Sequence, residues 1–148
     1  MAGSKVGSVV VAGGAGFIGS TFARLLVELG YERVRVFDKL TYAGNPANIA
    51  DLRDVPGFSF VEGDICDAEA VDAALDGFDA LVNFAAETHV DRSLLDPGGF
   101  IQTDVHGVWV LLEAARKHAL SRMVHVSTDE VYGVREDGSF SERDPLNP

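Results

Sequence analysis

The stretch SVVVAGGAGFIGS, residues 8–20, decides the fold of this chain. It opens on Ser8 to Ala12, a β-branched run that is typical of a buried parallel strand. Apolar residues at helical spacing continue to Gly30, a natural C-terminal stop for a helix. Between the strand and the helix lie three glycines with the spacing G-x-x-G-x-x-G, namely Gly13, Gly16 and Gly19. A strand, a glycine turn and a helix in this order predict a dinucleotide-binding unit.

Strand and helix patterns alternate through the rest of the chain. Further strands are predicted at residues 34–38, 58–61, 80–85 and 123–126, and helices at 46–52, 68–75 and 97–118. This alternation predicts an α/β fold: a Rossmann-like doubly wound parallel sheet of strand order 3-2-1-4-5 with helices on both faces. We expect residues 1–148 to form one domain that binds its ligand at the carboxyl ends of the strands.

Composition excludes several classes of protein and site. The net charge of −11 argues against nonspecific nucleic-acid binding, which depends on a basic surface. Cys66 is the only cysteine, so no internal disulfide and no zinc site of thiolates can form, and no metal site is predicted. The apolar run before Gly13 is too short for a signal peptide or a membrane span. We therefore expect a cytoplasmic protein with no membrane partner.

The glycine turn and an acid after the second strand predict an NAD site. Backbone N–H groups and the partial positive charge at the start of the helix can hold a pyrophosphate. Asp38 ends the second strand, 19 residues after Gly19, where a ribose-binding acid is expected. A carboxylate there accepts from the ribose hydroxyls and repels a 2′-phosphate, which favours NAD over NADP. The alternative for Asp38 is a solvated loop residue, and the neighbouring Lys39 is a cation that could tolerate the extra phosphate.

Asp64 follows the third strand, beside the position expected for the adenine. Its carboxylate could accept from the adenine amino group, or it could cap the next helix, and the sequence leaves both roles open.

Three longer segments carry a resemblance to a known family. They are DKLTYAGN at residues 38–45, FAAETHVDRS at 84–93 and STDEVYG at 127–133. Together with the glycine spacing they resemble the extended short-chain dehydrogenases/reductases, and within these the dTDP-glucose 4,6-dehydratase family, from about Ser8 to Pro148. The resemblance implies NAD as cofactor, a nucleotide sugar as substrate and a homodimeric parent protein. It also implies cofactor contacts by Phe17, Ile18, Lys39, Ile65 and Ala85, and contact of Thr88 with the substrate phosphates.

The implied reaction oxidises C4 of the glucose unit with NAD⁺, eliminates water across C5 and C6, and reduces C6 to give a 4-keto-6-deoxy sugar. Oxidation at C4 makes the C5 proton acidic, so the carboxylate of Glu130 can remove it. Asp129 would protonate the leaving hydroxide, and Thr128 would hydrogen-bond the C4 oxygen. Two neighbouring carboxyl groups with opposite roles need pKa values that differ. The alternative is that Asp129 and Glu130 are polar loop residues at the end of a strand.

The sequence predicts the roles of several other polar and aromatic residues less specifically. His89 and Arg92 could assist at the substrate or serve the fold. His125 is expected in the core, Tyr132 in packing, and Trp109 and Phe100 in the core or in a subunit contact.

Two departures from the family pattern matter. Family members usually have an asparagine where this chain has Asp104, which puts the local hydrogen-bond network in doubt. The superfamily's catalytic Y-x-x-x-K motif follows the fifth strand, whereas here no tyrosine lies beyond Tyr132 and no lysine beyond Lys117. We therefore expect the chain to be part of a longer enzyme, inactive by itself.

Alternative functions remain open. A UDP-glucose 4,6-dehydratase, or a related NAD-dependent epimerase or decarboxylase, comes second. Sugar-nucleotide epimerases of this branch usually carry small hydroxylated residues where Asp129 and Glu130 stand, which weighs against them. A non-catalytic NAD-binding module is the alternative of a different class.

Overall fold

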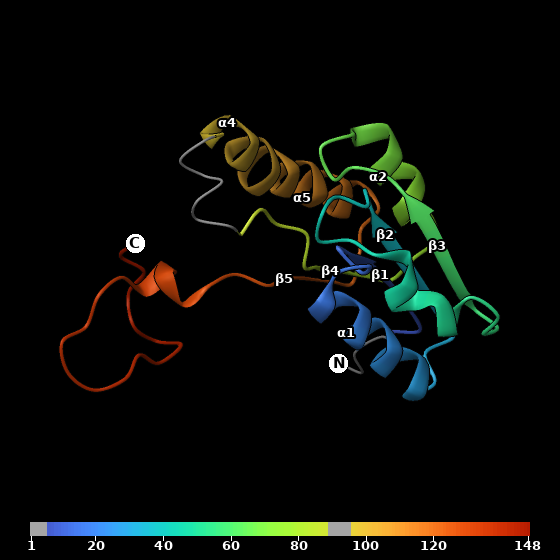
Figure 1. Ribbon diagram of the computed structural model, residues 1–148, viewed down its shortest axis with the longest axis horizontal. Coiled ribbons are helices and arrows are strands. Elements are labelled where there is room, and N and C mark those ends of the chain that lie inside the picture. The colour runs from blue at the N-terminus through green and yellow to red at the C-terminus, as the bar shows by residue number, and fades with distance from the viewer. Residues whose placement is uncertain (1–5, 89–95) are drawn as a thin grey trace.

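The computed structural model describes residues 6–88 and 96–148 and contains the predicted sheet (Figure 1). Five parallel strands lie in the order β3-β2-β1-β4-β5, which confirms the predicted fold class and strand order. The strands are β1 (Ser8–Ala12), β2 (Arg33–Asp38), β3 (Phe58–Glu62), β4 (Ala80–Asn83) and β5 (Arg122–His125). Every predicted strand is present, with ends that differ by at most two residues from those expected.

Helices cover both faces of the sheet, and the alternating side chains of β1 show how the two cores are divided. Val9 and Val11 pack with α1 (Phe17–Glu28) and with η1 (Pro46–Leu52), a 3₁₀ helix. Val10 and Ala12 point the other way and pack with α2 (Ala68–Leu75) and α5 (Val108–Lys117). Because successive strand residues face opposite sides, one fully buried strand serves both cores.

Side-chain caps set the start of two helices, which begin at the predicted residues. The Asn45 side chain accepts from the backbone N–H of Ala47 and opens η1. The Asp67 carboxylate accepts from the N–H groups of Glu69 and Ala70 and opens α2. Each cap satisfies N–H groups that have no partner inside the helix.

The long helix expected at 97–118 is present, but its geometry changes along its length. It begins as α4 (Pro97–Phe100), widens into the π-helix η2 (Ile101–Gly107) and continues as α5. Gly107 lies at the end of the wide part, where an added Cβ would come within 2.7 Å of the Ile65 side chain. A π-helical turn often marks a functional site, and this one faces the carboxyl edge of the sheet.

β5 and the segment that follows it are the most exposed part of the sheet. His125, expected in the core, is exposed at this edge, and its Nδ1 lies 3.1 Å from Nδ2 of Asn83, so that prediction was wrong. The 3₁₀ helix η3 (Asp129–Tyr132) comes next, in an arm that extends away from the sheet (Figure 1). The arm folds back on itself, since Asn147 donates to the carbonyl of Val131, and the Tyr132 ring stacks on Phe140.

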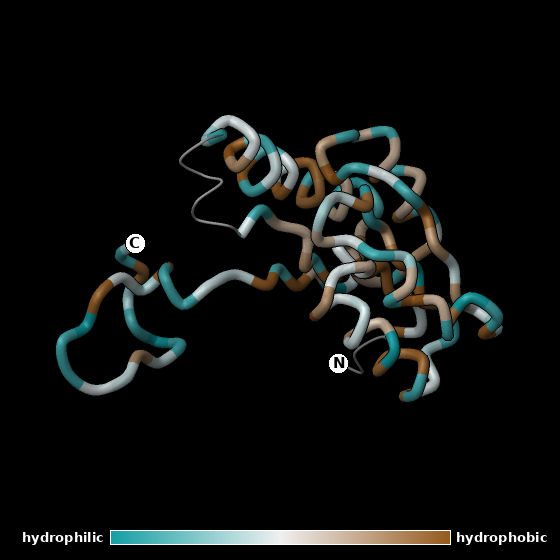
Figure 2. Tube along the Cα trace, viewed as in Figure 1, coloured by the Kyte–Doolittle hydropathy of each residue, from teal (hydrophilic) through white to brown (hydrophobic). Residues whose placement is uncertain are grey.

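Several apolar side chains lie on the outside of the body. Figure 2 shows apolar residues in the interior and also along the stretch that leads from β5 into the arm. Trp109, which the sequence placed in the core or a subunit contact, is 57% exposed. No helix in residues 6–88 and 96–148 is long and apolar enough to cross a membrane.

Candidate active site

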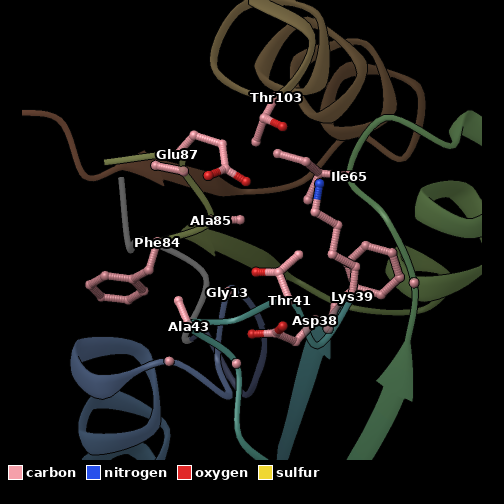
Figure 3. Close-up of a pocket in the computed structure, with 15 residues that line it drawn as sticks. Gly13, Asp38, Lys39, Thr41, Ala43, Ile65, Phe84, Ala85, Glu87 and Thr103 are labelled. Carbon is pink, nitrogen blue, oxygen red and sulfur yellow. The ribbon is translucent and has the colours of Figure 1, made fainter. Parts of the chain in front are cut away.

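A cleft opens at the carboxyl ends of β1, β2 and β4, where the fold predicts a ligand (Figure 3). In Figure 3 Asp38 and Thr41 lie on one side of it, and Glu87 and Thr103 on the other. Its lining comprises the glycine turn, the end of β2 with the following loop, the end of β3, the segment after β4 and the π-helix: Gly13, Gly16, Phe37, Asp38, Lys39, Thr41, Ala43, Gly44, Gly63, Ile65, Phe84, Ala85, Ala86, Glu87 and Thr103.

The glycine turn brings three backbone segments into contact. Gly13 has φ of 71°, and a Cβ there would lie 2.4 Å from the backbone nitrogen of Ala85. A Cβ on Gly19 would lie 2.3 Å from the carbonyl oxygen of Gly13. Gly16 is less confined and lines the cleft. The first and third glycines are therefore required by packing, and the second leaves the backbone open toward a ligand.

The N-terminus of α1 adjoins this turn, and no side chain there competes with a ligand for the free N–H groups of the helix. Gly16 is its N-cap, no side chain caps it, and its first turn contains no acid. Phe17 and Ile18, the first two residues of the helix, are 86% and 62% exposed. Uncapped N–H groups and the positive end of the helix fit an anionic ligand such as a pyrophosphate.

Asp38 lies at the end of β2 with its carboxylate turned into the cleft, only 9% exposed. One oxygen accepts from the N–H of Ala15 at 2.9 Å, and the other from the N–H of Leu40 at 2.8 Å. Two carboxylate oxygens offer about four acceptor positions, so this arrangement leaves capacity for two ligand hydroxyls. The vicinal hydroxyls of a ribose fit that capacity.

Lys39 and Asp64 form an ion pair at the edge of the cleft. The Lys39 ammonium lies 3.4 Å from one Asp64 oxygen, and the other Asp64 oxygen accepts from the N–H of Cys66. Burial raises the pKa of Asp64, but the hydrogen bonds from Cys66 and Lys39 outweigh it, so the pKa lies below its ordinary value. Asp67, and not Asp64, caps α2. Of the two roles left open for Asp64, the helix cap is thus filled by another residue.

The segment after β4 forms the opposite wall. Ala85 packs its backbone on Gly13 and lines the cleft together with the neighbouring Glu87. Thr88 is exposed beyond them, while the predicted roles of His89 and Arg92 lie outside the described residues. The Glu87 N–H donates to Asp104 of the π-helix at 2.9 Å.

Thr128, Asp129 and Glu130 lie apart from the residues that line the cleft. They follow β5 at the start of the exposed arm, where the Thr128 hydroxyl accepts from the N–H of Glu130 and donates to the Asp129 carboxylate. The three residues thus follow the end of a strand, as predicted, and the Thr128 and Asp129 side chains are bonded to each other. Their position relative to a bound sugar stays a prediction.

Sequence reasoning missed part of the cleft lining. Glu87 and Thr103 were not singled out, although Glu87 lies inside one of the segments with a family resemblance. Thr103 reaches the cleft from a π-helical turn, and hydrophobic periodicity carries no signal for such a turn. Among the described residues no group of three or more histidine, cysteine, aspartate or glutamate side chains could hold a metal ion.

Comparison with known proteins shows the family to which the chain belongs. A family model described as GDP-mannose 4,6 dehydratase matches residues 10–148. The dTDP-glucose 4,6-dehydratase of Streptomyces niveus is 49% identical over 145 residues, which is 95% of this chain and 43% of that protein.

Solved structures of related enzymes share the fold of this chain. The dTDP-glucose 4,6-dehydratase DesIV of Streptomyces venezuelae, crystallised with NAD and dTDP, superposes with a TM-score of 0.89 at 49% identity, over 95% of this chain and 45% of that one. UDP-glucose 4-epimerase of Brucella ovis, in complex with NAD, gives 0.82 at 34% identity, over 95% and 42%. This chain thus spans less than half the length of the relatives that it matches.

Proposed function

This chain belongs to the GDP-mannose 4,6 dehydratase family, and on that premise we propose that residues 1–148 form the NAD-binding domain of a sugar-nucleotide 4,6-dehydratase that acts on dTDP-glucose. One observation carries the cofactor part of this proposal. The buried Asp38 carboxylate and the uncapped start of α1 meet in one cleft, a ribose acceptor beside a phosphate site.

Specific residues would hold NAD in this cleft. The pyrophosphate would lie on the turn of Gly13, Gly16 and Gly19, against the N–H groups of Phe17 and Ile18. Asp38 would accept from the adenosine ribose, and its charge would exclude a 2′-phosphate. The adenine would lie near Asp64 and Ile65, with Lys39 and Ala85 as further contacts. When bound, NAD would supply the capacity to accept a hydride from the sugar and to return it.

The reaction rests on the residues after β5. Glu130 would remove the C5 proton as a base, Asp129 would donate a proton to the departing hydroxide, and Thr128 would hydrogen-bond the C4 oxygen. The hydrogen bonds that join the Thr128 hydroxyl to the Asp129 carboxylate and to the backbone N–H of Glu130 hold these three residues together and support a shared task. Thr88 would contact the substrate phosphates. Because the chain spans about 43% of the length of its relatives, this is the proposed activity of the whole protein.

A UDP-glucose 4-epimerase is the second candidate, because such enzymes superpose well on this chain. The two carboxyl groups of Asp129 and Glu130 favour the dehydratase, since an epimerase has no water to eliminate. A UDP-glucose dehydratase, an NAD-dependent decarboxylase and a non-catalytic NAD-binding module remain as further alternatives.

We also propose a cytoplasmic homodimer engaged in deoxysugar biosynthesis. The lone, half-buried cysteine is compatible with a reducing compartment. Four exposed apolar residues form one stripe along the long helix and would bury against a second copy: Ile101, Val105, Trp109 and Leu112.

The decisive experiment is an assay of the complete protein on two substrates. Purified protein is incubated with dTDP-glucose and with UDP-glucose, and products are separated by mass and by chromatography. Loss of one water from dTDP-glucose, giving a 4-keto-6-deoxy product, supports the proposal. Interconversion of glucose and galactose nucleotides would establish the epimerase, and absence of turnover with intact NAD binding would establish the non-catalytic module.

A further inference from the structure

Two hydrogen bonds connect three separate segments around the cleft. Asp104 in the π-helix η2 accepts from the N–H of Glu87, which lies after β4, at 2.9 Å. The Glu87 carboxylate in turn accepts from the hydroxyl of Tyr42, in the loop between β2 and η1, at 3.1 Å. The chain Asp104–Glu87–Tyr42 thus ties the π-helix to both walls of the cleft.

The Tyr42–Glu87 bond crosses the opening of the cleft. Thr41 and Ala43, on either side of Tyr42, line one wall, and Glu87 lines the other. Figure 3 shows Thr41 and Ala43 across the open space from Glu87. Both bonded side chains are accessible to solvent at this rim, so the bond lies at the mouth of the cleft and not in its depth. A ligand that spans the two walls has to pass this bond.

We propose that Asp104 is a positioning residue, which holds Glu87 so that Glu87 and Tyr42 close the mouth of the cofactor cleft. The inference rests on the proposed function, in which this cleft holds NAD. It adds a gate to that function: opening the Tyr42–Glu87 bond controls the entry and release of the dinucleotide. For a reaction that oxidises and then reduces the same sugar, a closed mouth keeps the cofactor in place between the two steps.

The surroundings of Asp104 suit a positioning role. The side chain is half-buried, belongs to the turn that also brings Thr103 to the cleft, and uses one oxygen for Glu87. The titratable groups that act on it are Glu87, His125 and Lys39, so it lies among residues from β5 and from both walls. Asp104 is bonded to the segment after β4 and would act on the cleft through that segment.

A gate and a direct contact have different kinetic signatures. Removing a residue that contacts the dinucleotide directly speeds its release and leaves its rate of entry unchanged. Removing a bond that closes the mouth of the cleft speeds both entry and release. The substitution Tyr42→Phe keeps the ring and its contacts and removes the hydroxyl. We expect Tyr42→Phe to raise the association and dissociation rate constants of NADH alike, by about two- to tenfold for one exposed hydrogen bond. The dissociation constant should change by less than about twofold.

Stopped-flow fluorescence of NADH with the unmodified protein and each variant measures both rate constants. Tyr31→Phe removes a tyrosine hydroxyl before the amino end of β2, away from the cleft, and is the matched control. Asp104→Ala should reproduce the Tyr42→Phe rates, because the Glu87 N–H loses its acceptor. Asp104→Asn keeps an acceptor oxygen and should restore the rates of the unmodified protein, with Asp54→Ala as an exposed-aspartate control.

Amide hydrogen exchange of residues 84–88, measured without cofactor, tests the positioning step by itself. Asp104→Ala should speed exchange of this segment, and Asp104→Asn should not. A rise in the dissociation rate constant alone for Tyr42→Phe would overturn the gate, and equal exchange in the alanine and asparagine variants would overturn the positioning role. Failure of the unmodified protein to bind NADH would instead refute the proposed function, and the exchange result would still decide the role of Asp104.

Discussion

The carboxylate of Asp38 accepts a 2.9 Å hydrogen bond from the backbone N–H of Ala15, and so the end of β2 fixes the glycine turn that follows β1. The residue proposed to bind ribose is therefore also part of the phosphate site. A single side chain links the two halves of the dinucleotide cleft, and its substitution should affect both ligand affinity and stability.

Asp38→Ala should weaken NAD binding by about tenfold or more and NADP binding less, because it removes both an acceptor for the ribose and a charge that repels a 2′-phosphate. It also leaves the Ala15 N–H without its acceptor, at a cost of about 1–3 kcal/mol in unfolding free energy. Calorimetric titration and urea unfolding measure the two effects. Asp38→Asn, which keeps an oxygen and loses the charge, separates them, and tighter binding of NADP by the unmodified protein would contradict the assignment.

Gly13→Ala should destabilise the fold by more than about 3 kcal/mol, since the new Cβ would lie 2.4 Å from the Ala85 nitrogen at a φ of 71°. Gly30→Ala is the matched control, because Gly30 has φ of 78° with no atom within 4 Å of an added Cβ. The control isolates the cost of the left-handed backbone, roughly 1–2 kcal/mol. If the two variants lost the same unfolding free energy in urea, an added Cβ at position 13 would not clash with Ala85.

The ionisation of Asp104 should lower the free energy of unfolding as pH rises. Burial raises its pKa and the charge of Glu87 raises it further, against the hydrogen bond from the Glu87 N–H and the charges of His125 and Lys39. The folded state then holds the proton more tightly than the unfolded state, so this contribution is present below the unfolded value of 3.8 and is lost as pH rises through the folded pKa. Asp104→Asn should raise the melting temperature at pH 7 by about 1–3 °C. Melting curves from pH 3 to pH 8 check this, and a gain that persists at pH 3 would contradict it.

A polypeptide of residues 1–148 should bind NAD and leave dTDP-glucose unchanged, because this stretch contains no Y-x-x-x-K motif to deprotonate the C4 hydroxyl. In the complete protein, Glu130→Gln should block loss of water and leave C4 oxidation intact. Absorbance of reduced cofactor should then rise without 4-keto-6-deoxy product. Asp129→Asn should slow water loss more mildly, since a water molecule can partly replace the acid. Full activity of the Glu130→Gln protein would refute the dehydratase assignment.

Trp109→Glu should convert the proposed dimer into a monomer, because a buried charge would replace an apolar contact in the stripe on the long helix. Light scattering after size exclusion measures the mass, and far-ultraviolet circular dichroism confirms that the helix persists. Glu113→Lys, on the same helix and exposed, is a control that should leave the mass unchanged.

The sequence predicted the fold well because its elements carry local signals. β1 has the predicted bounds, since a β-branched run ends abruptly at the glycine turn. Helices η1 and α2 begin at the predicted residues, because their caps, Asn45 and Asp67, bond N–H groups only two or three residues away. Asp38 could be placed in the cleft because the parallel topology brings the ends of β1 and β2 together.

Features that depend on distant contacts escaped prediction. The π-helical turn at Ile101–Gly107 has no periodic signature that differs from that of an α-helix. His125 reads as a core residue inside a strand pattern, and only its position on an edge strand exposes it. The Tyr42–Glu87 bond joins residues 45 positions apart through side chains alone, so no local pattern could indicate it.

β5 has a consequence for handling the polypeptide in solution. It ends the sheet, with no further strand beside it in residues 6–88 and 96–148, and Val124 is 43% exposed. Unpaired N–H and C=O groups on such an edge can template pairing with another molecule. Concentrated samples of residues 1–148 should therefore self-associate reversibly by edge-to-edge strand addition, and Val124→Lys should prevent this association by placing a charge on the edge.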